Sequence, residues 1–162
     1  MVQTSTLLAD TIFYVKDAIQ DNITDPISNR PTNQAFIMTS YPTRATTYPI
    51  ITIKDSNIQS RMTLGLKSEA SAFTIDVEIR IWANDTKIRD SLADDVYELL
   101  RTSQIGDTGT SQANALHDLR LLSSVNVDDP DGPKSKVMVI RYLFVQGSSA
   151  DDNVGLGALT LS

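Results

Sequence analysis

The clearest pattern along the chain is a strict alternation of apolar and polar side chains over residues 73–82. Its apolar positions are Phe73, Ile75, Val77, Ile79 and Ile81. Its other positions are Thr74, Asp76, Glu78, Arg80 and Trp82. Successive side chains of a strand point to opposite faces, so this spacing predicts a strand with one buried face. The other face is expected to be wet or to meet a partner, with Trp82 as a candidate anchor.

Helical spacing marks two further segments. The first begins near Thr4 or Ser5, either of which can cap it, and its apolar face is Leu8, Ile12, Val15 and Ile19, with Leu7 and Ala18 beside it. The second begins at Asn84 or Asp85, either of which can cap it, and runs to about Arg101. Its apolar stripe is Ile88, Leu92, Val96 and Leu99. The acidic residues of this second segment fall largely off the stripe and are expected to face solvent.

Shorter apolar runs predict the rest of a sheet. Strands are expected over residues 36–39, 50–54, 119–127 and 137–145, with a weaker alternation over 58–66. Loops are predicted over 22–35 and 103–114, and an acidic turn over 128–133. This order predicts an α+β fold: an antiparallel or mixed β-sheet with two main helices packed on one face, plus a C-terminal extended arm. We expect one α+β domain over residues 1–146 and a flexible arm over 147–162.

The composition is typical of a soluble globular domain. Its most informative feature is that the charged residues are unevenly distributed along the chain. Of the 162 residues, 41% are hydrophobic and 21% are charged. No apolar run approaches the roughly 20 residues that cross a membrane. The net charge is −6, and residues 84–131 hold 10 of the 20 acidic residues but 4 of the 14 basic ones. Nucleic-acid binding through a basic face is therefore a poor expectation, whereas the acidic block can repel polyanions, meet a basic partner or be a solvated face.

Motifs for catalysis and cofactor binding are scarce. The chain has neither a G-x-x-x-x-G-K-[ST] phosphate loop nor a dinucleotide fingerprint that opens a helix. One histidine, His117, and no cysteine exclude a zinc site with several nitrogen or sulfur ligands. Residues Asn126, Asp128, Asp129 and Asp131 cluster, but their spacing does not match a calcium loop. We therefore expect no enzyme activity, no cofactor and no metal. With no cysteine and no secretory signal, a reducing cytoplasm is the expected compartment.

Four features together resemble a known family. They are the helical start, the strand candidate Tyr48-Pro49-Ile50-Ile51-Thr52-Ile53, the strand of residues 73–82, and the helix sequence Lys87-Ile88-Arg89-Asp90-Ser91-Leu92-Ala93-Asp94-Asp95-Val96. Over roughly residues 3–145 this arrangement resembles the tail terminator and tail completion proteins of long-tailed bacteriophages. In many of those proteins such a strand leads into a helix of the Lys-x-x-Asp-x-Leu-Ala-Asp kind. The loop over 22–35 and the arm over 147–162 have no match there.

The resemblance implies a structural virion protein of the tail and neck, assembled in the host cytoplasm. It would form a ring, expected to be a hexamer, that caps the tail tube protein and offers its other face to head and neck connector proteins. DNA would pass through without specific binding, and no membrane is involved. Candidate subunit-interface residues are Asp76, Glu78, Arg80, Trp82, Val154, Leu156 and Leu159. Candidate acidic residues facing the channel are Asp90, Asp94, Asp95 and Glu98.

Other functions are also compatible with the sequence. Another neck protein, such as a head-completion or stopper protein, or a tail tube protein of the same particle, would share much of the resemblance. An unrelated ligand-binding α+β domain would be distinguished by a deep apolar pocket. An enzyme would need clustered carboxylates with a bound metal. The apolar arm can fray, or it can add as a strand to a neighbouring subunit.

Overall fold

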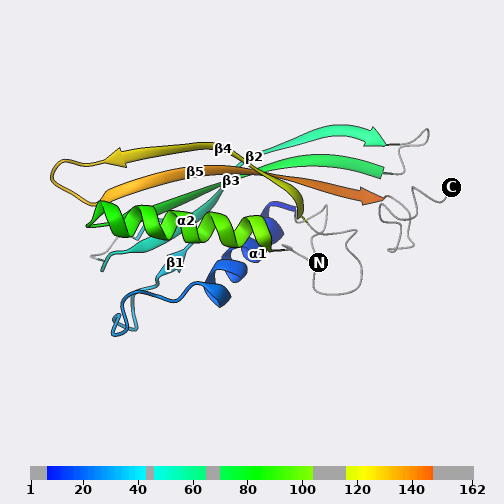
Figure 1. Ribbon diagram of the computed structural model, residues 1–162. Helices are drawn as coiled ribbons and strands as arrows, with labels where there is room; N and C mark the ends of the chain where they lie inside the picture. The colour runs from blue at the N-terminus through cyan, green and yellow to red at the C-terminus, as the bar shows by residue number, and fades with distance from the viewer. Residues whose placement is uncertain (1–6, 43–45, 65–69, 104–115, 148–162) are drawn as a thin grey trace.

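The computed structural model describes residues 7–42, 46–64, 70–103 and 116–147. Its elements are α1 (Leu7–Asn22), β1 (Ile37–Met38), β2 (Ile50–Leu64), β3 (Ala70–Ala83), α2 (Thr86–Thr102), β4 (Leu116–Asp128) and β5 (Lys134–Gly147). The strands form one five-stranded sheet in the order β1-β2-β3-β5-β4. The β1 strand is parallel to β2, and the other neighbours are antiparallel, so the sheet is mixed. Both helices lie on one face of it (Figure 1), which confirms the predicted α+β fold.

The core lies between the sheet and the two helices. The β3 strand supplies its centre, where Ile75, Val77, Ile79 and Ile81 are fully buried as the alternation predicts. Val15 of α1 and Val96 of α2 cover this row from the helix side and are also fully buried. Each side chain of this kind contributes roughly 1.5–3 kcal/mol when it leaves water. The period-two row therefore fixes where the helices pack.

The two helices bury faces that overlap the predicted stripes only in part. Val15 and Ile19 of α1 are buried as predicted, and so are Leu92 and Val96 of α2. In α1, Leu7 and Thr11 are buried while Leu8 is 41% exposed. The Thr11 hydroxyl is satisfied because it donates to the Leu7 carbonyl oxygen at 2.6 Å. In α2, Ile88 is 46% exposed whereas Arg89 is buried. Both predicted stripes counted apolar residues only, but a polar side chain whose hydrogen bonds are satisfied can occupy the buried face.

The β2 strand is longer than either of its predicted parts. It runs continuously through the two candidates over 50–54 and 58–66, as far as Leu64. Register shifts against β3 occur between Asp55 and Asn57 and again between Ser60 and Met62. An extra residue at such a bulge interrupts the alternation of side chains between faces. This interruption explains why the sequence showed two weak strands here and not one.

A single arginine holds the predicted loop over 22–35 against the start of β2. The Arg30 side chain is 6% exposed, and its guanidinium donates to the Asp25 carboxylate at 2.5 and 2.9 Å. It also donates to the carbonyl oxygens of Thr47 and Pro49 and lies 5.5 Å from the centre of the Phe36 ring. The hydrogen bonds from Arg30 hold the pKa of the Asp25 carboxyl below its ordinary value.

Several sequence predictions lie outside the described residues. These are the caps at Thr4 or Ser5, most of the loop over 103–114, and the arm from residue 148 onward. Within the described part of the chain, neither helix has the length and apolar character needed to cross a membrane.

Candidate interaction surface

The polar row of β3 lies on the face of the sheet that carries no helix, but it is not uniformly wet. Asp76 is 7% exposed because Arg141 of β5 lies directly opposite it. The Arg141 guanidinium donates to both carboxylate oxygens of Asp76, at 2.7 and 2.8 Å. Thr74 is buried as well, at 8% exposed. The expectation of a wet face is wrong at these two positions, and at Asp76 the cause is the Arg141 side chain of the neighbouring strand.

The other three residues of the row also contact their own sheet. Glu78 forms an ion pair with Lys54 at 3.3 Å. The Arg80 guanidinium lies 3.8 Å from the centre of the Trp82 ring, a cation–π contact, and donates to the Ser135 hydroxyl at 3.0 and 3.2 Å. The structure therefore brings Asp76, Glu78, Arg80 and Trp82 together on one face. Their role in a subunit interface stays a prediction.

Trp82 itself is half-buried. Its indole nitrogen donates to the Thr52 hydroxyl at 3.3 Å, and the Tyr41 ring packs against it with centres 4.7 Å apart. The Tyr41 hydroxyl meets the Tyr48 hydroxyl at 2.5 Å. Burial, together with this hydrogen bond, raises the pKa of Tyr48 to about 12. An aromatic corner of Tyr41, Tyr48 and Trp82 thus ends the polar row.

The acidic candidates of α2 separate into two groups. Asp94, Asp95 and Glu98 are exposed, and Glu98 pairs with Arg101 at 2.7 Å. Asp90 is instead engaged by two cations, Arg89 at 2.8 Å and Lys136 at 3.0 Å. These two partners lower the pKa of the Asp90 carboxyl, Arg89 more than Lys136. The exposure of Asp94, Asp95 and Glu98 agrees with their prediction as solvent-facing residues, and their role in a channel stays a prediction. Asp90 is instead part of a network of ion pairs.

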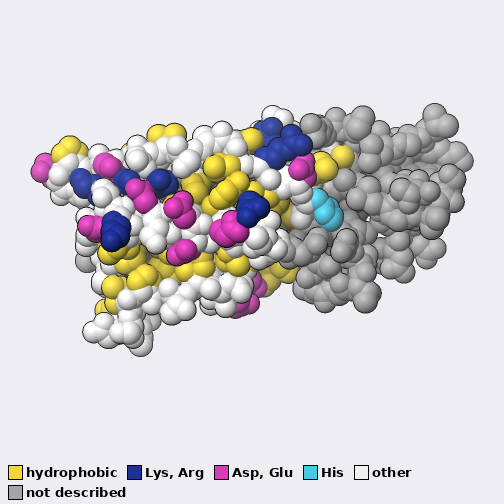
Figure 2. All heavy atoms as spheres, in the orientation of Figure 1, with side chains coloured by type: hydrophobic (Ala, Val, Ile, Leu, Met, Phe, Trp, Pro, Cys, Tyr) yellow, Lys and Arg dark blue, Asp and Glu magenta, His cyan; other side chains and the backbone are white. Residues whose placement is uncertain are grey.

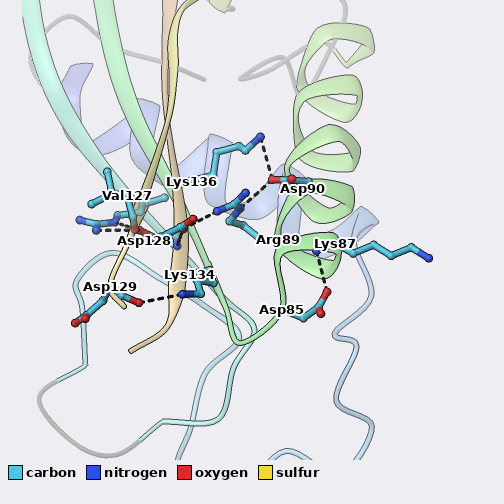
Figure 3. A network of polar contacts seen from close by, with 11 residues as sticks. Asp85, Lys87, Arg89, Asp90, Val127, Asp128, Asp129, Lys134 and Lys136 are labelled. Atoms are coloured by element: carbon cyan, nitrogen blue, oxygen red, sulfur yellow. Dashed lines mark hydrogen bonds and ion pairs between the residues drawn. The ribbon is translucent and has the colours of Figure 1, made fainter. Parts of the chain in front are cut away.

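That network is the feature that sequence reasoning missed (Figure 3). Arg89 of α2 is 3% exposed and donates to Asp90 at 2.8 Å and to Asp128 at 2.6 Å. Asp128 also accepts the backbone N–H of Ser135 at 3.2 Å. The Ser135 hydroxyl donates to the Val127 carbonyl oxygen at 2.6 Å and accepts from Arg80 on the other face of the sheet. The Arg89–Asp128 and Arg80–Ser135 contacts join residues 39 and 55 positions apart, so no local spacing could have predicted that the network is joined.

The acidic turn over 128–133 is organised by its own backbone and neighbours. Asp129 accepts from the Asp131 backbone N–H at 3.1 Å, and its carbonyl oxygen accepts from the Lys134 ammonium at 3.1 Å. A Cβ on Gly132 would approach the Asp129 carboxylate to 2.9 Å, so this position favours glycine. Within the described ranges, the structure has no group of three or more histidine, aspartate or glutamate side chains placed to hold a metal ion.

A hollow of about 810 Å³ lies beside α2. Its apolar lining comes from Ile23 and Pro26, which follow α1, and from Ile88, Leu92 and Leu99 of α2. Lys87, Asp95 and Glu98 supply charged groups at its rim. Figure 2 shows a band of hydrophobic side chains below α2 at this place. The hollow is lined mainly by apolar side chains but is open to solvent, whereas the ligand-binding alternative requires a deep apolar pocket.

His117, the only histidine, lies at the start of β4 and lines a second hollow of about 290 Å³ together with Arg101 and Tyr142. The Tyr142 hydroxyl is buried and has no hydrogen-bond partner among the described residues. Burial raises the pKa of Tyr142.

The outer strand β4 is the most apolar exposed element among the described residues. Half of the eight large hydrophobic side chains exposed in this part of the chain belong to it: Leu121, Leu122, Val125 and Val127. Hydrophobic side chains reach the surface at several places along the strand (Figure 2). Sequence reasoning predicted the strand but not its position at the edge of the sheet.

Comparison with known proteins gives no further assignment, because no protein-family model and no curated protein matches this chain.

Proposed function

We propose that this chain is a structural protein of a long-tailed phage particle, assembled in the host cytoplasm, that forms a ring at the end of the tail tube. The ring stops tube polymerisation and provides the attachment surface for head and neck proteins. The observation that carries the proposal is β4, where exposed apolar side chains gather along one outer edge of the sheet. Apolar surface concentrated on one element is typical of an assembly contact. Together with the resemblance over roughly residues 3–145, it favours a protein that works through its surfaces.

A closed ring needs two different surfaces on each copy, because one patch meets another patch on the next subunit. The edge of β4 is a candidate for the first. The helix-free face with Asp76, Glu78, Arg80 and Trp82 and the C-terminal arm are both candidates for the second. The arm residues proposed for the interface, Val154, Leu156 and Leu159, lie outside the described residues.

The exposed acids of α2 support a channel through which DNA passes without being held. Carboxylates of Asp94, Asp95 and Glu98 repel phosphates, whereas lysines at the same places would bind them. We expect the variant Asp94→Lys/Asp95→Lys to form rings normally but to slow DNA delivery from assembled particles. Normal assembly with normal DNA delivery by this variant would contradict the channel assignment.

Localisation tests the proposal most directly. Immunogold labelling of purified particles from the source of the protein should place the label at the head–tail junction alone. Label along the whole tube would identify a tube protein, and the absence of labelled particles would overturn the structural role. Particles assembled without the protein distinguish the neck layers. Loss of a terminator should give overlong tubes, whereas loss of another neck protein should leave tubes of normal length without heads.

A second candidate function, binding of a small apolar ligand, is favoured by the hollow beside α2. Native mass spectrometry of the purified chain would then show a bound small molecule. The substitution Ser91→Trp should fill the hollow and abolish the adduct, because Ser91 is exposed and lines it. Asp94→Trp, on the same helix but outside the lining, is the matched control and should retain the adduct. The ring proposal predicts no adduct in either case.

A further inference from the structure

The β4 strand presents an exposed edge over most of its length. Among the described residues it pairs only with β5, so no strand lies along its outer side there. Every residue from Arg120 to Asp128 is exposed. Free edges are normally protected by lysines, prolines, inward-pointing charges or bulges. The β4 strand has a register shift against β5 between Leu121 and Ser123, so its regularly paired edge runs from Ser123 to Asp128. The run from Leu121 to Val127 contains neither a charged residue nor a proline, so this edge has the character of a surface that another strand covers.

Both ends of β4 are held, which keeps the edge formed before a partner arrives. At its start, Leu116 is 4% exposed and pairs with Phe144 in the core. At its end, Asp128 accepts from Arg89 and from the Ser135 backbone (Figure 3). An incoming strand therefore meets an ordered backbone, and the conformational entropy lost on binding comes mainly from the incoming segment.

The side chains along the β4 edge indicate which kind of strand would pair with it. Val125 pairs with Val137 on the helix-free face, whereas Leu121 pairs with Ile140 on the helix face. An uncharged strand with apolar side chains would extend both rows. Residues 154–161 have this composition, Val-Gly-Leu-Gly-Ala-Leu-Thr-Leu, without charge or proline. The edge from Leu121 to Asp128 faces seven residues of β5, Ile140 to Lys134, because of the register shift after Leu121. A strand of about 24 Å would cover it, and the segment is long enough to supply one.

We propose that residues 154–161 of a neighbouring copy add as a strand to the free edge of β4. The inference rests on the proposed ring, because donor and acceptor belong to different copies. The β5 strand ends beside the start of β4, so the chain's own segment would run along β4 in the parallel direction. A neighbour's segment can run antiparallel, which is the more stable pairing. Donor and acceptor are different surfaces, so the contact passes from copy to copy and can close into a ring.

Cross-linking between single-cysteine variants tests the pairing, because the chain has no cysteine of its own. The acceptor carries Val125→Cys near the middle of the edge, and the donor carries Ala158→Cys near the middle of the segment. The two full-length proteins are mixed at high concentration with a short bis-maleimide, which tolerates a small offset in register. We expect a covalent heterodimer at least tenfold more abundant than with the control donor Leu8→Cys, which places the thiol on the exposed side of α1.

Three results would overturn the inference. Cross-linking of Ala158→Cys at the level of the Leu8→Cys control would show that the segment does not reach the edge. Dominant homodimers of Val125→Cys alone would show that β4 pairs with a second β4. An internal cross-link within the double variant Val125→Cys/Ala158→Cys, without heterodimers in the mixture, would assign the edge to the chain's own segment. Heterodimers without label at the head–tail junction would instead support the pairing and contradict the proposed function.

Discussion

At the scale of single residues, the main departure from the sequence pattern is a charge on the buried face of a helix. Arg89 is 3% exposed, while its neighbour Ile88 is 46% exposed. The guanidinium is compatible with burial because two carboxylates hold it, and Asp90 and Asp128 remain 45% and 36% exposed to water. These carboxylates hold the pKa of Arg89 above its ordinary value, with Asp90 as the larger cause. The contribution of such a buried cation to the stability of the fold depends on the carboxylates that pair with it.

Comparison of two variants isolates the cost of that buried charge. The double variant Asp90→Ala/Asp128→Ala leaves Arg89 buried without a carboxylate, whereas the triple variant with Arg89→Met removes the charge and retains an apolar side chain of similar length. We expect the triple variant to be more stable than the double variant by about 2 kcal/mol in the free energy of unfolding. Urea unfolding followed by Trp82 fluorescence measures the difference. A triple variant less stable than the double one would show that Arg89 acts mainly through other contacts.

At the scale of elements, the local sequence of α2 indicates where the helix begins and where it ends. Its start was predicted at Asn84 or Asp85, and the structure selects Asp85. The Asp85 carboxylate accepts from the backbone N–H groups of Lys87 at 2.8 Å and Ile88 at 3.1 Å. At the other end, Arg101 lies in the last turn, where a cation suits the helix dipole. The helix therefore begins and ends close to the positions indicated by its sequence.

Substitution of the cap tests this assignment. Asp85→Ala leaves two backbone donors of the first turn without their acceptor, and we expect a loss of about 1 kcal/mol in the free energy of unfolding. Asn84→Ala is the matched control, since Asn84 precedes the cap and is exposed, and should change stability by less than about 0.5 kcal/mol. Thermal or urea unfolding of both variants measures the effect. A larger loss for Asn84→Ala would reverse the assignment of the cap.

At the scale of the whole molecule, three arginines join segments that are far apart in the sequence. Arg30 joins the segment after α1 to the start of β2. Arg89 joins α2 to the end of β4, and Arg141 joins β5 to β3. Both Asp25 and Asp90 have carboxyl pKa values that are lowered by their cationic partners. The free energy of unfolding of the chain should therefore depend on pH in the acidic range.

The direction of this dependence follows from the lowered pKa values. Each carboxyl binds its proton more weakly in the folded chain than in the unfolded chain, where the pKa is about 3.9. The stabilisation is present above that value and is lost as the pH falls through the lowered folded value. Unfolding in urea between pH 6 and pH 2.5 should show this loss, and Asp25→Asn/Asp90→Asn should reduce its slope. Ser91→Ala, an exposed position without a titrating group, should keep the original slope. An unchanged slope in the double variant would contradict this account.

The sequence by itself determined the elements and the α+β class, because periods of two and 3.6 residues are local properties of the backbone. The alternation over 73–82 predicted β3, and the cap with its apolar spacing predicted α2. The same alternation indicated which face of β3 would form the core, because the apolar side chains from Ile75 to Ile81 all lie on one face of the strand. The proposed resemblance to phage tail terminators rests on these two segments together with the helical start and the strand candidate over residues 48–53.

Only the tertiary structure decided which polar groups are buried and which apolar groups are left outside. Asp76 is covered because Arg141, 65 residues away, lies opposite it, and Arg89 is paired because Asp128 lies 39 residues away. The strand order places β4 at the edge, and this position leaves Leu121 and Val125 exposed even though both are paired with β5. Burial depends on neighbours brought from distant parts of the chain, and a local pattern carries no information about them.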